Sequence, residues 1–301
     1  MGKIKVSVPA TTANLGPGFD TLGCALRLYN TFTFELTDSG LIITGCDKKY
    51  AGPDNLCYTA FRKTYEKLGL PLPPGLKIDI DALVPVSRGL GSSSTLLVAG
   101  AMAANYFAGS PLSKKDILSI TNELEGHPDN VAPAIFGGLV ASAVRSGRPL
   151  YVRYSVSPDI LFTAVVPDFE TSTEEARAVL PHDIPRLDAV YTVGCLALLL
   201  KALETGDRDA ISAALDDRLH QPYRKKMIDE YDEVRGAALA EGCDGFIISG
   251  SGSTCLCVGG DKEFARRLQE KLKSLKHSWK VYPLEIDECG ARLFEEEQNA
   301  E

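Results

Sequence analysis

The stretch "RGLGSSSTLLVAG", residues 88–100, places two glycines and three serines directly before an apolar run. Gly89 and Gly91 leave room beside the backbone, and the first amide groups of the following helix lack partners within that helix. Such a loop can bring several N–H groups onto one anion, which the helix dipole also favours. Ser92, Ser93 and Ser94 add hydroxyls that can bind phosphate oxygens or Mg²⁺. The stretch therefore predicts a phosphate-binding loop that begins a buried helix.

Other glycine-rich motifs fit this stretch poorly. No lysine follows the glycines as it does in a P-loop, and no final glycine completes a GxSxG nucleophile elbow. Taken alone, the residues are equally compatible with a Gly/Ser connection that binds nothing.

The composition limits the class of protein and its partners. The chain has 301 residues, of which 45% are hydrophobic and 24% charged, as in folded soluble proteins of about two domains. A net charge of −8 and the lack of a Lys/Arg block argue against nucleic acid as a partner. The N-terminal "MGKIKVSVPATTANLG" has no signal-peptide core, and no apolar run approaches the roughly 18 residues of a membrane span. We expect a cytoplasmic protein without a membrane partner.

The eight cysteines have no CxxC pair and no nearby histidines. They are typical of reduced core thiols rather than of a disulfide framework or a structural zinc site. Cys255 and Cys257 alternate along a predicted strand, and we expect both to be small buried hydrophobic residues.

Hydrophobic periodicity predicts an α+β fold in two units. Short alternating strands are expected at 3–10, 30–37, 41–45 and 76–83, with helices at 55–70, 93–109 and 113–126 and a strand at 138–144. The pattern resets near residues 155–157, so we assign residues 1–155 to an N-terminal domain and 156–301 to a C-terminal α+β domain. The closing "FEEEQNAE", residues 294–301, is expected to be a solvated end.

Three motifs together resemble those of one kinase family. "PVSRGLGSSS", residues 85–94, resembles the phosphate loop of the GHMP kinases, which phosphorylate small molecules. "PATTANLGPGFDTLGCAL", residues 9–26, and "EGHPDNVAPAIFGG", residues 125–138, resemble the members that phosphorylate homoserine. The resemblance runs from about residue 3 to the last predicted strand. It implies an N-terminal domain of the ribosomal S5 domain 2-like type, a ferredoxin-like C-terminal domain and an active site in the cleft between them.

The resemblance also implies the activity. It is the transfer of phosphate from ATP, with Mg²⁺, to L-homoserine, which makes O-phospho-L-homoserine for threonine synthesis, in a protein that is a homodimer in this family. A kinase of the same fold with another acceptor and a ligand sensor without catalysis remain the alternatives.

By the same resemblance, one group of residues binds ATP and Mg²⁺. The phosphate ligands come from the loop, and Asn55 in "GPDNLCY" would contact the base side. Ser92 and Glu123 would hold Mg²⁺, although Glu125 competes with Glu123 because the spacing to the following histidine varies in the family. Without the neighbouring "HPDN" motif, Glu123 would be interpreted as an exposed helix carboxylate. The residues expected around ATP are Asn55, Arg88, Gly89, Leu90, Gly91, Ser92, Ser93 and Ser94.

A second group is assigned to the amino-acid substrate. Arg forks suit its carboxylate, and carboxylate or amide oxygens suit its ammonium. Arg177 and Arg224 are assigned to the substrate carboxylate, although each could be a solvated charge, Arg224 as part of a basic turn. The other alternative is a Gly/Pro turn at "NLGPGFD" whose polar side chains satisfy only the backbone. The residues expected in this pocket are Asn14, Asp20, His127, Asn130, Thr173, Arg177 and Arg224.

Two positions bear on the mechanism. Asp129 resembles the aspartate proposed as a base in mevalonate-kinase-like relatives, but we rank positioning and charge stabilisation ahead of a side-chain base. Ser253 in "SGSGST" stands where the family usually has proline, and we expect the loop to be looser as a result without loss of activity.

Overall fold

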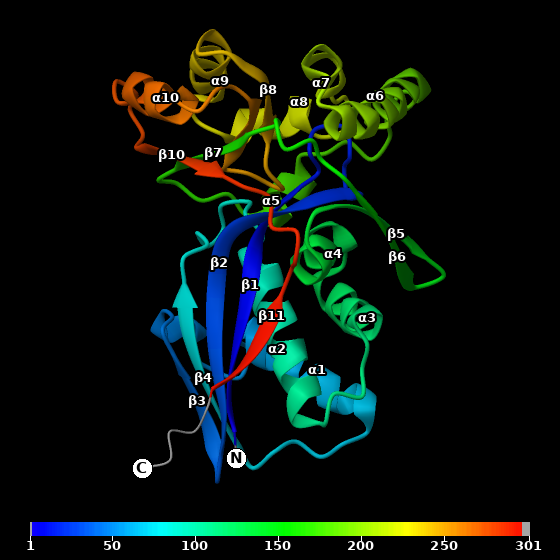
Figure 1. The fold of residues 1–301 in the computed structure, drawn as a ribbon, viewed down its shortest axis with the longest axis vertical. Coiled ribbons are helices and arrows are strands. Elements are labelled where there is room, and N and C mark those ends of the chain that lie inside the picture. The colour runs from blue at the N-terminus through cyan, green and yellow to red at the C-terminus, as the bar shows by residue number, and fades with distance from the viewer. Residues whose placement is uncertain (1, 297–301) are drawn as a thin grey trace.

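The computed structural model describes residues 2–296, whose strands form two sheets, one in each half of the molecule (Figure 1). In the first sheet the strand order is β11-β1-β2-β4-β3, with β5 on β2 and β6 on β5. All these pairs are antiparallel except β3 with β4. The strands are β1 Lys3–Ala13, β2 Leu22–Thr37, β3 Gly40–Thr44, β4 Gly75–Ala82, β5 Leu139–Arg145, β6 Arg148–Tyr154 and β11 Arg292–Glu296.

Four helices cover one face of this sheet (Figure 1). They are α1 Leu56–Leu68, α2 Ser92–Phe107, α3 Lys114–Glu125 and α4 Pro128–Phe136. The buried faces of β1 and β2, with Phe32 and Phe34, pack in one cluster with Phe61 of α1 and the apolar residues of α2. Burial on nearly all sides explains why α2 is apolar around its whole circumference and why the phosphate-loop stretch begins a central helix.

The helix α3 begins close to the predicted start at residue 113, and the structure shows a capping box between Ser113 and Asp116 there. Helix α4 was not predicted, because Pro128 and Pro133 interrupt its pattern. Pro128 is tolerated in the first turn, where its missing N–H would have had no helical partner.

The second sheet is antiparallel, with strand order β10-β7-β9-β8. The helices α6, α7, α9 and α10 cover its outer face (Figure 1). The α+β class is therefore confirmed. The strands are β7 Phe162–Pro167, β8 Cys243–Ile248, β9 Cys255–Gly259 and β10 Trp279–Leu284; the helices are α5 Thr173–Ala178, α6 Arg186–Thr205, α7 Arg208–Ala214, α8 Gln221–Arg224, α9 Tyr231–Ala240 and α10 Phe264–Leu272, with short 3-10 turns η1 Lys48–Tyr50 and η2 Lys225–Met227.

The end of the chain corrects the predicted division at residue 155. The sheets change between β6 and β7, but β11 returns to pair with β1, and Ile286 bridges to Leu26 of β2. The chain thus crosses back, and its last described strand belongs to the first half. Of the predicted solvated end, residues 294–296 lie in β11 and residues 297–301 lie outside the described residues.

The cysteine prediction agrees with the structure. All eight cysteines are free, and Cys255 and Cys257 are fully buried in β9. Among residues 2–296, no helix is both long enough and apolar enough to cross a membrane.

Candidate active site

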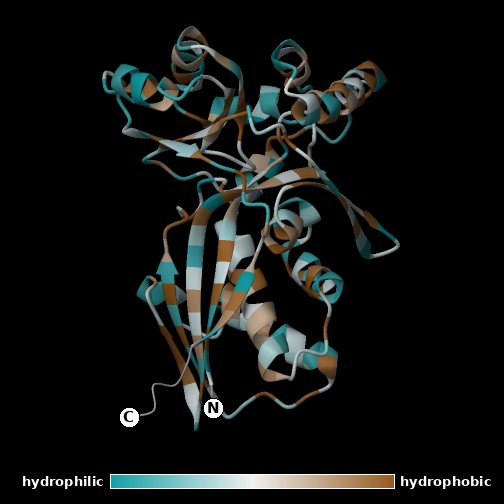
Figure 2. Cartoon of the chain, in the orientation of Figure 1, coloured by the Kyte–Doolittle hydropathy of each residue, from teal (hydrophilic) through white to brown (hydrophobic). Residues whose placement is uncertain are grey.

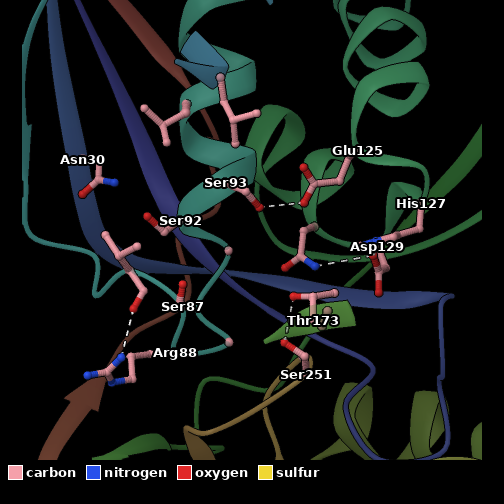
Figure 3. A pocket seen from close by; sticks show the side chains of 18 of the residues that line it. Asn30, Ser87, Arg88, Ser92, Ser93, Glu125, His127, Asp129, Thr173 and Ser251 are labelled. Atoms are coloured by element: carbon pink, nitrogen blue, oxygen red, sulfur yellow. Dashed lines mark hydrogen bonds and ion pairs between the residues drawn. The ribbon is translucent and has the colours of Figure 1, made fainter. Parts of the chain in front are cut away.

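A cavity of about 490 Å³ lies between the two halves and takes its lining from both. Figure 3 shows the loop before α2 at its centre, with Glu125, His127 and Asp129 on one side and Thr173 and Ser251 from the second half facing them. Half of the lining residues are ones that the sequence predicts: Asn14, Asp20, Asn55, Arg88, Gly89, Gly91, Ser92, Ser93, His127, Asp129, Asn130, Thr173, Arg177 and Arg224.

The phosphate loop has the backbone that its glycines suggest. Gly89 and Gly91 are left-handed, with φ of 73° and 68°, and Gly91 is the N-cap of α2 without a capping side chain. A Cβ on Gly91 would lie 1.9 Å from Oγ1 of Thr11, so the turn has no space for a side chain. The first amides of α2 therefore begin at the cavity without helical acceptors, which is the geometry of an anion site.

Two predicted loop residues, Leu90 and Ser94, do not line the cavity, and a third, Arg88, lines it but uses its guanidinium elsewhere. Arg88 donates to the carbonyls of Pro167 (3.2 Å) and Asp168 (3.0 Å) and pairs with Glu170, so it ties the loop to the end of β7. Leu90 is buried, and its carbonyl accepts from the Thr11 amide. Ser94 is fully buried too. The buried side chains of Leu90 and Ser94 support the loop from inside the protein.

The two candidate metal carboxylates are separated by the turn of α3. Glu125 lines the cavity, and its Oε1 accepts hydrogen bonds from the hydroxyls of Ser93 (2.8 Å) and Ser94 (3.0 Å) (Figure 3). Glu123 is instead paired with Lys67 (2.9 Å) and Lys63 (3.0 Å) of α1.

Hydrogen bonds from these two lysines lower the pKa of Glu123. Glu123 does not line the cavity, contrary to the expected position, and Glu125 is the carboxylate next to the loop serines. Helical geometry explains the difference, because residues two apart point to different sides of a helix.

One end of the cavity is suited to a nucleoside. Its lining is largely apolar, with Leu56, Ile80, Ala82, Val86 and Leu96. Asn55 lies here, and its side chain is partly occupied: it caps α1 by accepting from the Cys57 amide (2.9 Å) and donates to the Tyr50 carbonyl (2.9 Å). Asn55 therefore shapes this end and keeps one N–H and one acceptor site of its amide for a ligand.

The other end holds charged groups. Arg177 of α5 makes a two-pronged ion pair with Asp20, with Nη2–Oδ1 at 2.8 Å and Nη1–Oδ2 at 3.1 Å. Arg224 is 2% exposed and donates to the carbonyls of Ala176 (2.9 Å) and Gly250 (3.1 Å). Burial, followed by the charge of Arg177, lowers the pKa of Arg224 to about 10, so it is still a cation at neutral pH. Two guanidinium groups and one carboxylate thus meet at this end.

The loop "NLGPGFD" that carries Asp20 is held in an unusual conformation. Asn14, Leu15 and Asp20 have positive φ, which costs free energy in residues other than glycine and is often found at functional sites. The amide of Asn14 bridges the loop, since its Oδ1 accepts from the Asp20 N–H (3.0 Å) and its Nδ2 donates to the Gly250 carbonyl (2.8 Å). Asn14 thus bonds only backbone groups, as the Gly/Pro-turn alternative expects, and positions Asp20, whose carboxylate instead pairs with Arg177.

Sequence reasoning missed the aromatic support beneath the two arginines. The centroid of the Phe19 ring lies 5.1 Å from the Arg224 guanidinium and 5.9 Å from that of Arg177. His220, fully buried, stacks on this ring at 5.1 Å and contacts the Gly16 carbonyl through Nε2 (2.9 Å). Phe19 adjoins Asp20 in the quoted motif, but its contact with residues far along the chain has no signal in one sequence.

The "HPDN" segment forms the wall between the two ends. Nδ1 of His127 lies 2.5 Å from Oδ1 of Asp129, and Asn130 accepts from the Thr11 hydroxyl (2.7 Å). Burial alone would lower the pKa of His127, but the hydrogen bond and charge of Asp129 outweigh it and raise that pKa. Thr173 completes the wall through a 3.2 Å contact with Ser251 (Figure 3).

The loop "SGSGST" closes the cavity from the second half. Ser249 donates to the Gly89 carbonyl (2.6 Å), and the Thr254 amide donates to the Arg88 carbonyl (3.1 Å). Ser253 is fully buried, and its hydroxyl donates to the Phe169 carbonyl (2.6 Å). We expected the loop to be looser without the proline. This hydrogen bond instead holds the loop in place, so Ser253 restores part of the rigidity that a proline would give.

Comparison with known proteins agrees with this arrangement. Family models match residues 55–138 (GHMP kinases N terminal domain) and 199–277 (GHMP kinases C terminal). A curated protein of Clostridium botulinum (strain ATCC 19397 / Type A) named homoserine kinase is 43% identical over 95% of this chain and 97% of its own.

Two solved structures are similar over nearly the whole chain. Homoserine kinase from Cytophaga hutchinsonii has a TM-score of 0.87 at 29% identity, covering 98% of both chains. A putative homoserine kinase from Listeria monocytogenes has a TM-score of 0.80 at 31% identity, covering 97% of this chain and all of its own.

Proposed function

Because the chain belongs to the GHMP kinase family, we propose that it transfers the γ-phosphoryl group of ATP to the side-chain hydroxyl of L-homoserine. One observation carries the proposal: the same cavity is lined by the N-terminus of α2 at one end and by a carboxylate and two guanidinium groups at the other. The helix N-terminus suits a polyphosphate. The three charged groups suit an amino acid, which has one positive and one negative group.

The charged end gives each group of the amino acid a partner. Asp20 would accept hydrogen bonds from the ammonium, and Arg177 and Arg224 would donate to the carboxylate. Asp20 and Arg177 pair with each other in this structure, so a bound zwitterion replaces one ion pair with two of the same kind. This exchange limits the cost of removing charges from water and favours substrates that carry both groups.

The loop serines and Glu125 fit a magnesium ion. Mg²⁺ prefers hydroxyl and carboxylate oxygens, and the structure brings the Ser93 hydroxyl to 2.8 Å from Oε1 of Glu125 at the cavity wall. We assign the ion to these two residues in place of Ser92 and Glu123. When bound, Mg²⁺ would neutralise charge on the β- and γ-phosphates.

Transfer then depends mainly on position. The homoserine oxygen attacks the γ-phosphorus as the bond to the β,γ-bridging oxygen breaks, and ADP leaves. The hydroxyl proton goes to a γ-phosphate oxygen or to water. Asp129 is the second choice for this proton, because one of its oxygens lies only 2.5 Å from Nδ1 of His127. We rank His127 and Asp129 as groups that orient the acceptor.

Steady-state ADP release with a panel of acceptors tests this function. L-homoserine should exceed L-threonine, L-serine, mevalonate and galactose, and the product should be O-phospho-L-homoserine by mass spectrometry. Two truncated acceptors test the charged end: 4-hydroxybutyrate lacks the ammonium, and 3-amino-1-propanol lacks the carboxylate. Turnover with mevalonate or galactose alone would indicate another acceptor, and saturable ATP binding without any turnover would indicate a sensor.

We place this reaction in the cytoplasm. The eight free cysteines of the chain, six of them buried, are in keeping with a reducing compartment.

A further inference from the structure

The helix α8 is preceded by a buried histidine that the proposed transfer does not use. The helix is hydrophilic along its length (Figure 2), yet Arg224 at its end is 2% exposed and His220 before it is fully buried. Buried polar side chains need hydrogen-bond or charge partners, which fix where they lie. The centroid of the Phe19 ring lies 5.1 Å both from the ring centroid of His220 and from Cζ of Arg224. His220 therefore contacts the same loop, residues 14–20, as Arg224 does.

The imidazole of His220 donates one hydrogen bond across the boundary between the two halves. Its Nε2 lies 2.9 Å from the carbonyl oxygen of Gly16. A carbonyl oxygen can only accept, so the proton must be on Nε2. Burial lowers the pKa of His220 and keeps the ring neutral, which leaves Nδ1 without a proton. Nδ1 is buried and has no partner among residues 2–296, so the ring acts as a donor to this single carbonyl.

A buried carboxylate fixes the direction of this donor. Asp217 is 3% exposed and accepts from three backbone amides, those of Leu219 (2.8 Å), His220 (2.9 Å) and Gln221 (2.8 Å). Its Oδ2 also lies 3.5 Å from Nε2 of His220. These hydrogen bonds hold the turn that enters α8, so the imidazole has little freedom to turn away from Gly16.

The loop also packs closely against the segment before α8. Gly16 has a φ of 72°, and a Cβ at this position would lie 2.7 Å from the carbonyl oxygen of Leu215. The absence of a side chain lets the two backbones approach to this distance. The Phe19 ring stacks on His220 with 21° between the ring planes. A backbone contact, a ring stack and a hydrogen bond thus dock the loop on residues 215–220.

We propose that His220 is a positioning residue that sets the separation between Asp20 and Arg224. The inference rests on the proposed function, in which Asp20 binds the substrate ammonium and Arg224 its carboxylate. Both groups are on one carbon of an α-amino acid, so their separation is fixed and their partners must match it. Asp20 belongs to the first half and Arg224 to the second. The hydrogen bond from His220 to Gly16 joins the two segments that carry them.

Two variants separate the ring of His220 from its N–H group. His220→Phe keeps a ring against Phe19 but leaves the buried Gly16 carbonyl without its donor. His220→Gln loses the ring but has an amide N–H that can reach the same carbonyl. His220→Phe should raise the KM for L-homoserine about tenfold, the effect of one unsatisfied buried group, and leave the KM for ATP unchanged. His220→Gln should restore most of the affinity for L-homoserine.

Truncated acceptors distinguish a change of separation from general damage to the site. 4-Hydroxybutyrate and 3-amino-1-propanol each have only one of the two charged groups, so the separation does not affect their binding. His220→Phe should lower the preference for L-homoserine over either compound about tenfold, with little change in kcat/KM for the compounds themselves. Equal losses with all three acceptors, or an unchanged preference, would overturn the proposal.

The matched control is Val234→Ala, at a fully buried residue of α9 in the second half. The cavity left by this change should lower the thermal melting temperature. It should leave the preference among the acceptors as in wild type, because α9 carries none of the proposed substrate ligands. A Val234→Ala protein with the same loss of preference as His220→Phe would show that lowered stability alone causes the effect, and would overturn the proposal.

Hydrogen exchange tests the docking of the loop without any substrate. The loop is closed by hydrogen bonds from the Asn14 amide to the Leu22 carbonyl (2.7 Å) and from the Asp20 amide to Oδ1 of Asn14 (3.0 Å). In His220→Phe, amides of residues 14–22 should exchange at least about tenfold faster, while those of α2 stay as in wild type. Unchanged exchange in this loop would overturn the proposal. A wild type without turnover would count against the proposed function alone, because the exchange result does not depend on it.

Discussion

Replacing Glu125 with glutamine should remove most of the catalytic rate while leaving the fold intact. The amide oxygen of the new side chain can still accept from the hydroxyls of Ser93 and Ser94, which now lie 2.8 and 3.0 Å from Oε1 of Glu125. The lost quantity is the negative charge. Removal of one group that stabilises the transition-state charge costs about 10²–10³ in kcat. We expect a loss of that size for Glu125→Gln.

The matched control is Glu123→Gln, two residues earlier on the same helix. Its carboxylate is half-exposed and pairs with Lys63 and Lys67, away from the cavity. Exposed pairs of this type contribute little to stability and have no path to the reacting phosphate. The turnover of Glu123→Gln should therefore remain within about threefold of wild type, a change no larger than the small energies of such pairs.

The assay is ADP release at saturating ATP and homoserine while free Mg²⁺ is varied. Glu125→Gln should need more Mg²⁺ for half-maximal rate in addition to its lower kcat, and Glu123→Gln should not. If Glu125→Gln kept full turnover at low Mg²⁺, or if Glu123→Gln lost as much as Glu125→Gln, the assignment of the metal to the loop serines and Glu125 would be refuted.

Three further predictions concern other parts of the site. Phe19→Leu should raise the KM for homoserine about tenfold, with the KM for ATP unchanged, because two cation–π contacts of about 0.5–2 kcal/mol each are lost; Phe19→Tyr should retain most of the affinity, and equal effects on both substrates would contradict the role. Gly91→Ala should lower the free energy of unfolding by at least about 1–2 kcal/mol, the cost of a left-handed alanine, and should weaken ATP binding because Thr11 must move; unchanged calorimetric ATP affinity would contradict this. The raised pKa of His127 means that its pairing with Asp129 stabilises the fold fully below the ordinary imidazole pKa of about 6.5 and less as pH rises through the raised value. Urea unfolding at pH 5.5 and 9 should show wild type losing its advantage over His127→Asn at the higher pH; a constant difference would show that the pair does not titrate as described.

The sequence predicted the local features of this fold well. The glycine loop before α2, the start of α3 near residue 113 and the alternating strands each follow from a few neighbouring residues, and the structure has all of them. The sequence did not predict the elements whose structure depends on contacts between residues far apart in the chain. Helix α4 survives two prolines because it is buried, and β11 returns to β1 across nearly the whole chain.

The candidate site shows the same limit. The motifs placed most of the expected residues in one cavity, but they could not decide between Glu123 and Glu125, since that choice depends on which side of α3 faces the loop. They also could not show that Arg88 and Asn55 use their polar atoms within the protein. Those atoms are committed to carbonyls and amides that only the folded chain brings near.

The two halves of the site are linked through one short loop. Gly250 accepts from Asn14 and from Arg224, and the neighbouring Ser249 donates to the carbonyl of Gly89. The same loop thus contacts the segment that carries Asp20, a proposed carboxylate ligand and the phosphate loop. A shift of this loop would move the acceptor groups and the phosphate groups together, which keeps the distance between the two substrates constant. In-line transfer requires that constancy, because an error of about 1 Å in the position of the reacting atoms can cost about 10²-fold in rate.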